Sequence, residues 1–152
     1  LGRERVAVAD LLAELTHNFE PLAQNSQVSL VVKDESAGAV LTGKRKSLVS
    51  ALTSVLENAL QAVNGRSEAR IALSAWCEED RVLLAVEDNG CGMDQMTATR
   101  VFEPFYTTRS EGTGLGLAIA RGVVLAHGGS LEVVSSPDAG ATFSISLPCL
   151  NS

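Results

Sequence analysis

The sequence lacks the features that mark several common protein classes. It has only three cysteines, Cys77, Cys91 and Cys149, and no Cys-x-x-Cys pair, so neither a disulfide framework nor a zinc site is indicated. A reducing, cytoplasmic compartment fits that cysteine usage. Basic residues are outnumbered, 12 against 18 acidic ones, and the net charge of −6 argues against a nucleic-acid-binding surface. No apolar run approaches the roughly 20 residues that a membrane-spanning helix needs.

The 152 residues are enough for one compact domain. Apolar residues make up 45% of them, which is typical of a chain with a packed core. The chain begins at Leu1 without an initiating methionine or a signal peptide. We therefore expect residues 1–152 to be one domain of a longer protein, which itself could be anchored to a membrane.

Hydrophobic periodicity predicts three helices and at least five strands. Apolar residues recur at helical spacing in some stretches and alternate with polar residues in others. We predict an α/β two-layer sandwich, in which a mixed, mostly antiparallel sheet carries the helices on one face. Pro21 is expected to kink or end the first helix. The predicted helices span 8–24, 45–63 and 115–127, and the predicted strands include 28–33, 71–75, 82–86, 131–133 and 143–147.

The segment from Glu87 to Leu115 has little periodic structure and is unusually long. It spans roughly 25 residues, whereas loops longer than about 12–15 residues in a compact domain are usually functional or disordered. It is dense in glycine, proline and aromatic residues. We therefore expect a functional loop here.

The predicted helix 45–63 carries a polar stripe opposite its apolar one. Glu57 and Asn58 are adjacent on this stripe, and Gln61 follows one turn later. The amide oxygen of Asn58 has the chemistry of a magnesium ligand, and the Glu57 carboxylate that of a group that orients a water or a hydroxyl. Taken alone, a solvated helix face is the commoner explanation of such a stripe.

Asp88 ends a predicted strand and is followed by Asn89, Gly90, Cys91 and Gly92. The two glycines let the backbone turn sharply and approach a ligand closely. A carboxylate at the strand end can accept a hydrogen bond from an exocyclic amine. An ordinary Asp-Asn-Gly turn explains the same residues about equally well.

A second glycine-rich segment, 112–117, opens an apolar helix. Unpaired amides at a helix N-terminus, on a backbone with few Cβ atoms, form a ready phosphate site. Two familiar nucleotide motifs are excluded, because no lysine follows Lys46 and the third glycine is misplaced for Gly-x-Gly-x-x-Gly. A flexible hinge is the alternative interpretation.

Taken in order, these segments resemble the characteristic boxes of bacterial sensor histidine kinases. Residues 56–59 look like the N box, 88–93 like the first glycine box, 102–109 like the F box and 112–117 like the second glycine box. The tail from 126 to 148 follows the family as well, so the resemblance covers nearly the whole chain. The F box is most similar to that of the nitrogen- and flagellar-regulation kinases.

The resemblance implies an ATP-binding catalytic domain of the type shared with gyrase, MutL and the heat-shock chaperones. It implies that Asp88 binds the adenine amino group, that Asn58 holds the Mg²⁺ that bridges the phosphates, and that Glu57 polarises the acceptor imidazole. A lid at about 95–113 would close over ATP, with Arg109 meeting the γ-phosphate. The implied nucleotide contacts are Asn58, Gln61, Asp88, Gly90, Gly92, Met93, Thr108, Gly112, Thr113, Gly114, Leu115, Gly116, Leu117 and Thr142.

Two positions depart from the family pattern. Many relatives have Gly-Asp where this chain has Gly43 and Lys44, and Gly-Thr where it has Gly140 and Ala141. That threonine can support the adenine site in the family, so Thr142 or a water would have to replace it here. Three aromatic residues of the F box are expected to anchor the lid or contact a partner domain, namely Phe102, Phe105 and Tyr106.

The phosphoacceptor is expected to lie outside the chain. The family uses a histidine followed by an acidic residue and then a proline, but His17 is followed by Asn18, and Pro21 comes one place early. His127 is expected to be structural. We therefore expect a monomeric domain that transfers the γ-phosphoryl group of Mg-ATP to a histidine on a separate helical dimerisation domain, with a response regulator downstream.

Two other functions stay open at this point. One is a nucleotide-sensing module that binds ATP without transferring it, for which Ala141 and the missing acceptor are the support. The other is a gyrase- or MutL-like ATPase arm, against which the F box argues.

Overall fold

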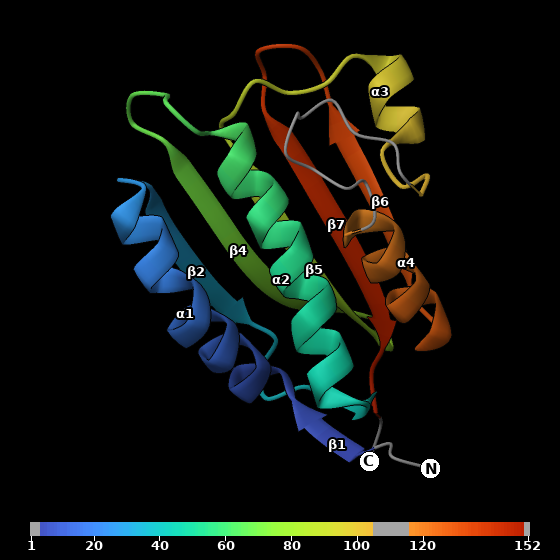
Figure 1. The fold of residues 1–152 in the computed structure, drawn as a ribbon. Coiled ribbons are helices and arrows are strands. Elements are labelled where there is room, and N and C mark those ends of the chain that lie inside the picture. The colour runs from blue at the N-terminus through green and yellow to red at the C-terminus, as the bar shows by residue number, and fades with distance from the viewer. Residues whose placement is uncertain (1–3, 105–115, 151–152) are drawn as a thin grey trace.

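The computed structural model describes residues 4–104 and 116–150, which form a two-layer sandwich (Figure 1). One layer is a five-stranded sheet with the order β2-β4-β5-β7-β6. The other layer consists of α1 (Val8–Asn25), α2 (Arg45–Ala62) and α4 (Gly116–Ala126), which cover the same face of the sheet. This arrangement confirms the predicted fold class.

The sheet is mixed but mostly antiparallel. β2 (Ser29–Glu35) runs parallel to β4 (Arg70–Glu78), and the other neighbouring pairs are antiparallel. The remaining strands of this sheet are β5 (Arg81–Asp88), β6 (Ser130–Ser135) and β7 (Ala141–Pro148). β4–β5 and β6–β7 form hairpins, and the acidic residues Glu79 and Asp80 turn the first of them.

Three elements of the described residues were not predicted. β1 (Glu4–Ala7) and β3 (Val40–Gly43) pair as a separate antiparallel ribbon, and each is only four residues long, too short for its alternation to stand out. α3 (Gln95–Arg100) lies inside the segment that was expected to lack periodic structure. Its N-cap is Asp94, whose Oδ1 accepts a hydrogen bond from the Thr97 amide at 2.8 Å.

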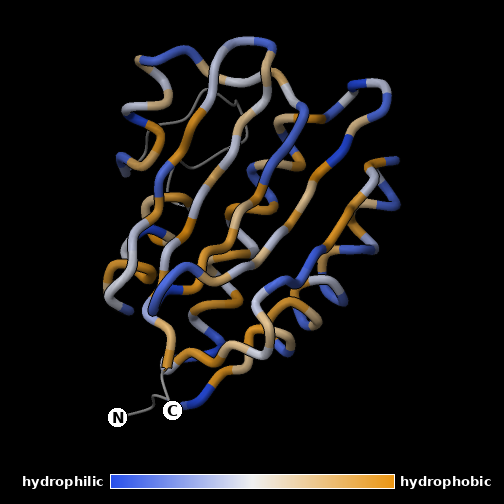
Figure 2. Tube along the Cα trace, turned by 180° about the vertical axis from the view of Figure 1, so that it is seen from behind, coloured by the Kyte–Doolittle hydropathy of each residue, from blue (hydrophilic) through white to orange (hydrophobic). Residues whose placement is uncertain are grey.

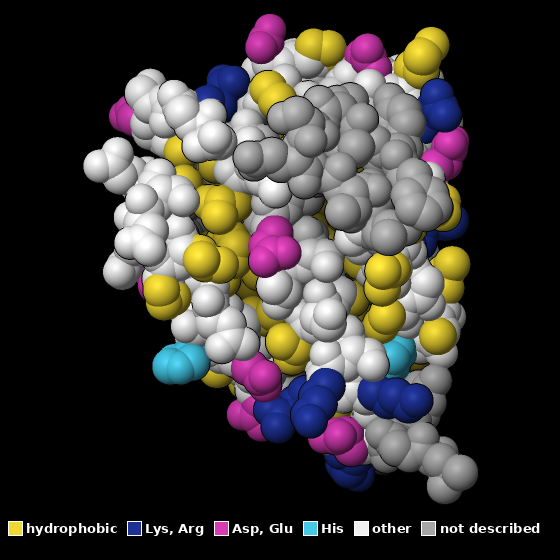
Figure 3. Space-filling view, viewed as in Figure 1, with side chains coloured by type: hydrophobic (Ala, Val, Ile, Leu, Met, Phe, Trp, Pro, Cys, Tyr) yellow, Lys and Arg dark blue, Asp and Glu magenta, His cyan; other side chains and the backbone are white. Residues whose placement is uncertain are grey.

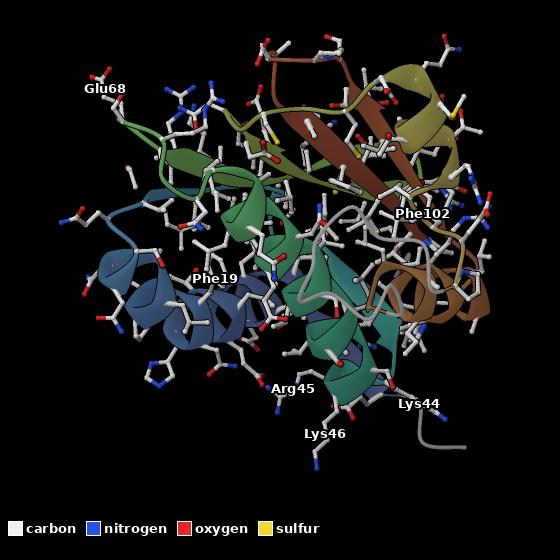
Figure 4. The ribbon with its side chains drawn as sticks, turned by 45° about the horizontal axis from the view of Figure 1, so that its top comes forward. Phe19, Lys44, Arg45, Lys46, Glu68 and Phe102 are labelled. Carbon is white, nitrogen blue, oxygen red and sulfur yellow. The ribbon has the colours of Figure 1, made fainter. Side chains whose placement is uncertain are left out.

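The core lies between the sheet and the helix layer. Alternate residues of the strands face the helices, and Leu73, Leu84 and Ile145 are each at most 1% exposed. Phe19, which is 2% exposed, points from α1 into the same layer (Figure 4). Burying such a side chain stabilises the fold by roughly 1.5–3 kcal/mol. α1 continues through Pro21 to Asn25, close to the predicted bounds, so of the two effects expected of Pro21 an early end of the helix does not occur.

The other face of the sheet is not covered by a helix of the described chain (Figure 2). The half-buried side chains of Trp76 and Leu83 lie on this face, because they alternate with the core residues of β4 and β5. In the part of the chain that the structure describes, no helix is long and apolar enough to cross a membrane.

Three segments that are distant in sequence converge at one end of the molecule. They are the end of α2, the end of β5 and the β6–β7 turn at 136–140 (Figure 1). β1 lies at the opposite end. This convergence brings the loop that follows Asp88 against the end of α2 at Ala62.

Candidate functional site

Asp88 is the buried charged residue of this end of the fold. It ends β5, and its side chain faces the helix layer with 4% of its surface exposed. The Oδ1 atom accepts a hydrogen bond from the Gly90 amide at 2.8 Å, whereas no described residue bonds the buried Oδ2 atom. Burial raises the pKa of Asp88, and the backbone amides of Gly90 and Ala141 offset only part of this rise. A buried acceptor without a partner is costly, so Oδ2 is suited to a ligand that donates.

The loop that follows Asp88 is fixed by hydrogen bonds to three surrounding elements. Asn89 Oδ1 accepts from the Arg70 amide at 2.8 Å, which ties the loop to the start of β4. The Cys91 amide donates to the Ala62 carbonyl at 3.2 Å, at the end of α2. The Cys91 carbonyl accepts from the Asp138 amide at 2.7 Å, in the β6–β7 turn. The loop therefore holds the Asp88 carboxylate in place before any ligand arrives.

Gly90 and Gly92 allow this loop to pack closely against neighbouring backbone. A Cβ atom at Gly90 would lie 2.5 Å from the Ala62 carbonyl oxygen. Gly92 has a φ of +68°, and a Cβ atom there would overlap the Ser136 carbonyl oxygen. Sequence reasoning had both glycines turn the backbone sharply and shape the base pocket. In the structure their bare Cα atoms face protein backbone, so they allow the loop to take its place after Asp88. Met93, half-buried, packs against the core, and its amide donates to Ser135 Oγ at 2.9 Å.

The polar stripe of α2 leads toward this loop. Glu57 and Gln61 are exposed and Asn58 is half-buried, one turn before the Ala62 carbonyl that holds Cys91. At the start of α4, a Cβ atom on Gly116 would lie 3.8 Å from the Ser54 side chain of α2. The next residue, Leu117, is buried with 8% of its surface exposed. The fold therefore brings the beginning of α4 against the stripe that carries Asn58.

Several predicted site residues fall outside the described part of the chain. They are Thr108, Arg109, Gly112, Thr113, Gly114 and Leu115, together with the aromatic residues Phe105 and Tyr106. Phe102 is described, and it packs edge-on against Phe143 with 6.0 Å between ring centroids. The Arg121 guanidinium lies 5.9 Å above the same ring. These contacts support the predicted anchoring role of Phe102.

The position of Thr142 argues against the adenine-supporting role that sequence reasoning gave it. In the β5–β7 ladder Thr142 is paired with Glu87, and Ala141 is paired with Asp88. Side chains alternate along a strand, so Thr142 lies on the open face of the sheet while Asp88 faces the helices. Ala141, which is 6% exposed, is the residue across from Asp88.

Sequence reasoning also missed the groups that hold the site together. The Ser135 hydroxyl accepts from Met93 and donates to the Gly140 carbonyl at 2.7 Å, which joins the loop to the β6–β7 turn. The Ala62 carbonyl has a similar role. A backbone acceptor carries no residue-type signal, and one serine between a strand and a turn is unremarkable in a sequence.

The chain matches the family model described as histidine kinase-, DNA gyrase B-, and HSP90-like ATPase over residues 43–151. It therefore belongs to this ATPase family. Within the family, it corresponds to the catalytic ATPase domain of the sensor histidine kinases, because its relatives are named as such kinases. The resemblance drawn from the four sequence boxes is thus confirmed.

Two curated relatives and one solved structure illustrate the similarity. The chain is 32% identical over 145 residues to the signal transduction histidine-protein kinase AtoS of Escherichia coli, covering 95% of this chain and 24% of that protein. It is 37% identical over 147 residues to the sensor protein kinase FleS of Pseudomonas aeruginosa, covering 97% of this chain and 36% of that protein. Full-length ShkA in complex with AMPPNP matches with a TM-score of 0.87 at 25% identity, covering 100% of this chain and 32% of that one. The chain thus spans well under half the length of these relatives.

Proposed function

We propose that this domain binds Mg-ATP and transfers the γ-phosphoryl group to a histidine on a separate helical domain of the same kinase. The observation that carries the proposal is the buried, unbonded Oδ2 atom of Asp88 at the end of a preorganised loop. Membership of the ATPase family supports ATP as the ligand. Among the described residues, no histidine has the sequence pattern of the family's phosphoacceptor. In the parent protein, a response regulator would receive the phosphoryl group next.

The Asp88 carboxylate fits an adenine base better than a guanine base. The adenine ring carries an exocyclic amine that donates hydrogen bonds, whereas guanine presents a carbonyl oxygen at the equivalent position. A buried carboxylate with one open acceptor stabilises the donor and repels the carbonyl. The Oδ2 atom of Asp88 would therefore give the domain a preference for ATP over GTP.

The residues near Asn58 fit a magnesium ion only if the nucleotide brings part of the coordination shell. Among the described residues, no group of three or more His, Cys, Asp or Glu side chains lies close enough together to hold a metal. Magnesium is usually bound by one or two protein oxygens together with water and substrate phosphates. Asn58, half-buried on α2, would supply the protein oxygen, and the ion would neutralise phosphate charge.

The remaining proposed roles concern the acceptor histidine and the phosphate groups of ATP. Glu57 is exposed on α2, so an imidazole on a separate domain can reach its carboxylate. Gln61, Gly116 and Leu117 would line the path of the phosphates between α2 and α4. Arg109 would stabilise charge on the γ-phosphate, and the segment at about 95–113 would close over ATP, of which residues 95–100 form α3.

Phosphotransfer to a separately supplied acceptor domain tests this function. The unaltered chain, incubated with radiolabelled Mg-ATP and the helical acceptor domain of the same kinase, should label a histidine. Asn58→Asp should abolish labelling without altering the circular dichroism spectrum, whereas Ser50→Ala, two turns earlier on the same helix, should label normally. Equal labelling by Asn58→Asp would contradict the assigned role of Asn58, and tight ATP binding without any labelling would indicate a sensing module.

A further inference from the structure

His127, the residue after α4, bonds two elements that are distant in sequence. Its Nε2 atom accepts a hydrogen bond from the Lys44 amide at 3.1 Å, at the junction of β3 and α2. Its Nδ1 atom lies 2.8 Å from the Val123 carbonyl oxygen, one turn back in α4. The imidazole thus connects the end of α4 to the beginning of α2.

These partners determine where the imidazole carries its proton. The Lys44 amide can only donate, so Nε2 must be unprotonated, and the Val123 carbonyl can only accept, so Nδ1 must carry the hydrogen. His127 is therefore a neutral imidazole in the Nδ1–H form. A charged imidazolium would turn its Nε2–H toward the Lys44 N–H and break the connection.

The fit of this ring against the backbone of the junction is close. A Cβ atom on Gly43 would lie 2.7 Å from Nε2 and closer still to Cδ2, so any larger residue at this position displaces the imidazole. His127 is seated over the bare Cα atom of Gly43. The glycine before α2 is explained by this contact.

The start of α2 needs support from outside the helix. Its N-cap residue, Lys44, makes no side-chain capping hydrogen bond, and Lys44, Arg45 and Lys46 place positive charge at the positive end of the helix dipole. The three side chains project outward (Figure 4), and basic side chains gather at this end of the helix face (Figure 3). Within the described chain, the supporting contacts include His127 and two ion pairs of Arg45, with Glu14 at 2.6 Å and with Glu4 at 4.0 Å.

α2 and α4 run antiparallel side by side (Figure 1). His127 bonds the end of α4 to Lys44 at the start of α2, and Gly116 at the start of α4 lies near Ser54 in the middle of α2. α2 carries Asn58, and the first residues of α4 are proposed to face the phosphates. The distance between these groups depends on how the two helices are held relative to each other.

We propose that His127 is a positioning residue that sets α4 against α2 and so fixes the phosphate end of the site relative to Asn58. This inference rests on the proposed function. His127 touches neither nucleotide nor acceptor, and it acts through the two helices that it joins. Its effect must therefore be visible in nucleotide affinity as well as in stability.

Two substitutions separate the two bonds of the ring. His127→Asn retains a donor near the Nδ1 position but cannot reach Lys44, whereas His127→Gln places an amide oxygen where Nε2 accepts. Calorimetric titration with AMPPNP and Mg²⁺ should show affinity about three- to tenfold weaker in His127→Asn, the scale of one lost hydrogen bond. His127→Gln retains an acceptor for the Lys44 amide, so its AMPPNP affinity should lie within about twofold of that of the unaltered protein.

Independent readouts test the connection without nucleotide. Nitrogen NMR of the imidazole near neutral pH should show protonated Nδ1 and unprotonated Nε2, and hydrogen exchange at the Lys44 amide should be faster in His127→Asn than in His127→Gln. Gly43→Ala should displace the ring and reproduce the His127→Asn affinity, whereas Gly122→Ala, on the exposed side of α4, should not.

The outcomes that overturn the proposal differ from those that overturn the proposed function. A charged or Nε2-protonated ring would refute the connection itself. A lower melting temperature with unchanged AMPPNP affinity in folded His127→Asn would refute the positioning role and leave a purely structural one. If the unaltered protein does not bind AMPPNP, both the proposed function and this positioning role are refuted. The protonation of the two imidazole nitrogens, measured by NMR, would still decide whether His127 joins the helices.

Discussion

Ala141 lies directly across from Asp88 in the β5–β7 ladder, on the same buried face of the sheet. The backbone amide of Ala141 lowers the pKa of the Asp88 carboxyl, but its methyl group has no donor to add, and the Oδ2 atom has no hydrogen-bond partner among the described residues. The pair thus leaves an acceptor open toward the helix layer. Several consequences of this arrangement can be measured on the nucleotide-free protein.

Ala141→Ser should stabilise the protein without nucleotide. A hydroxyl across from Asp88 can donate to the open carboxylate oxygen, and such a bond to a charged group is worth about 1.5–3 kcal/mol, less the cost of burying the hydroxyl. We expect a net gain of about 1 kcal/mol in the free energy of unfolding, measured by urea denaturation. Ala75→Ser is the control, because Ala75 is fully buried on β4, and it should destabilise by about 1–3 kcal/mol. Equal destabilisation by both substitutions would show that the Asp88 oxygen is not available.

Asp88→Asn should change how stability depends on pH. Burial raises the pKa of Asp88, so between the unfolded and the folded pKa values the native state binds more protons than the unfolded state. Stability from this group is therefore lost as pH rises from about 4 through the raised pKa. Relative to the unaltered protein, Asp88→Asn should gain stability steadily over that range, as measured by melting temperatures at a series of pH values. A constant difference across the series would mean that Asp88 is not destabilised by burial.

Asp94 should show the opposite dependence on pH. The Thr97 amide holds the pKa of this exposed carboxyl below its usual range. Its capping contribution is present above the unfolded pKa and is lost as pH falls through the folded one. The protection factor of the Thr97 amide against hydrogen exchange should therefore fall on acidification and should be low at all pH values in Asp94→Ala. Protection of Thr97 in that variant would contradict the capping role.

Gly92→Ala should destabilise the fold by roughly 2–4 kcal/mol, because the residue has a positive φ and its Cβ atom would overlap the Ser136 carbonyl. Chemical denaturation provides the measurement. Gly122→Ala is the matched control, since nothing lies near its Cβ position on α4, and it should stabilise by about 0.5–1 kcal/mol. A neutral Gly92→Ala would show that the loop and the β6–β7 turn are not packed as described.

Lys44→Asp should stabilise α2 by about 1 kcal/mol, since the N-cap backbone is extended and an aspartate there can cap the first turn and complement the dipole. For a domain of this size, that gain corresponds to a rise of about 2–4 °C in melting temperature. Lys44→Gln removes the charge without adding a short capping group, so it should give less than half of the effect. Identical gains from both substitutions would assign the effect to charge alone.

Sequence patterns predicted the layers of the fold because the core elements are long and strongly periodic. α2 and the β4–β5 hairpin are examples, and Asp88 was recognised because a strand leads directly into it. The four-residue strands β1 and β3 were missed, since their pairing partners lie far apart in the chain. The sequence did not indicate on which face of the sheet Thr142 lies, because the side of a strand residue depends on register, which the pairing with β5 defines.

The glycines show a second limit of sequence reasoning. Gly90 and Gly92 were correctly singled out, but the reason for them is contact with the Ala62 and Ser136 carbonyl groups. Likewise, nothing in the sequence indicates that His127 is seated over Gly43, 84 positions earlier. Close approaches between distant backbone segments follow from tertiary packing, which local pattern does not encode.

Calorimetric titration of this domain with AMPPNP, with and without Mg²⁺ and beside Asp88→Asn, shows whether Asp88 binds the adenine base. We predict magnesium-dependent binding that Asp88→Asn weakens by roughly 1.5–3 kcal/mol, the scale of a charge-assisted hydrogen bond. GTP should bind far more weakly to the unaltered protein. Unchanged affinity in Asp88→Asn, or equal affinity for ATP and GTP, would contradict the assignment of the buried carboxylate to the adenine base.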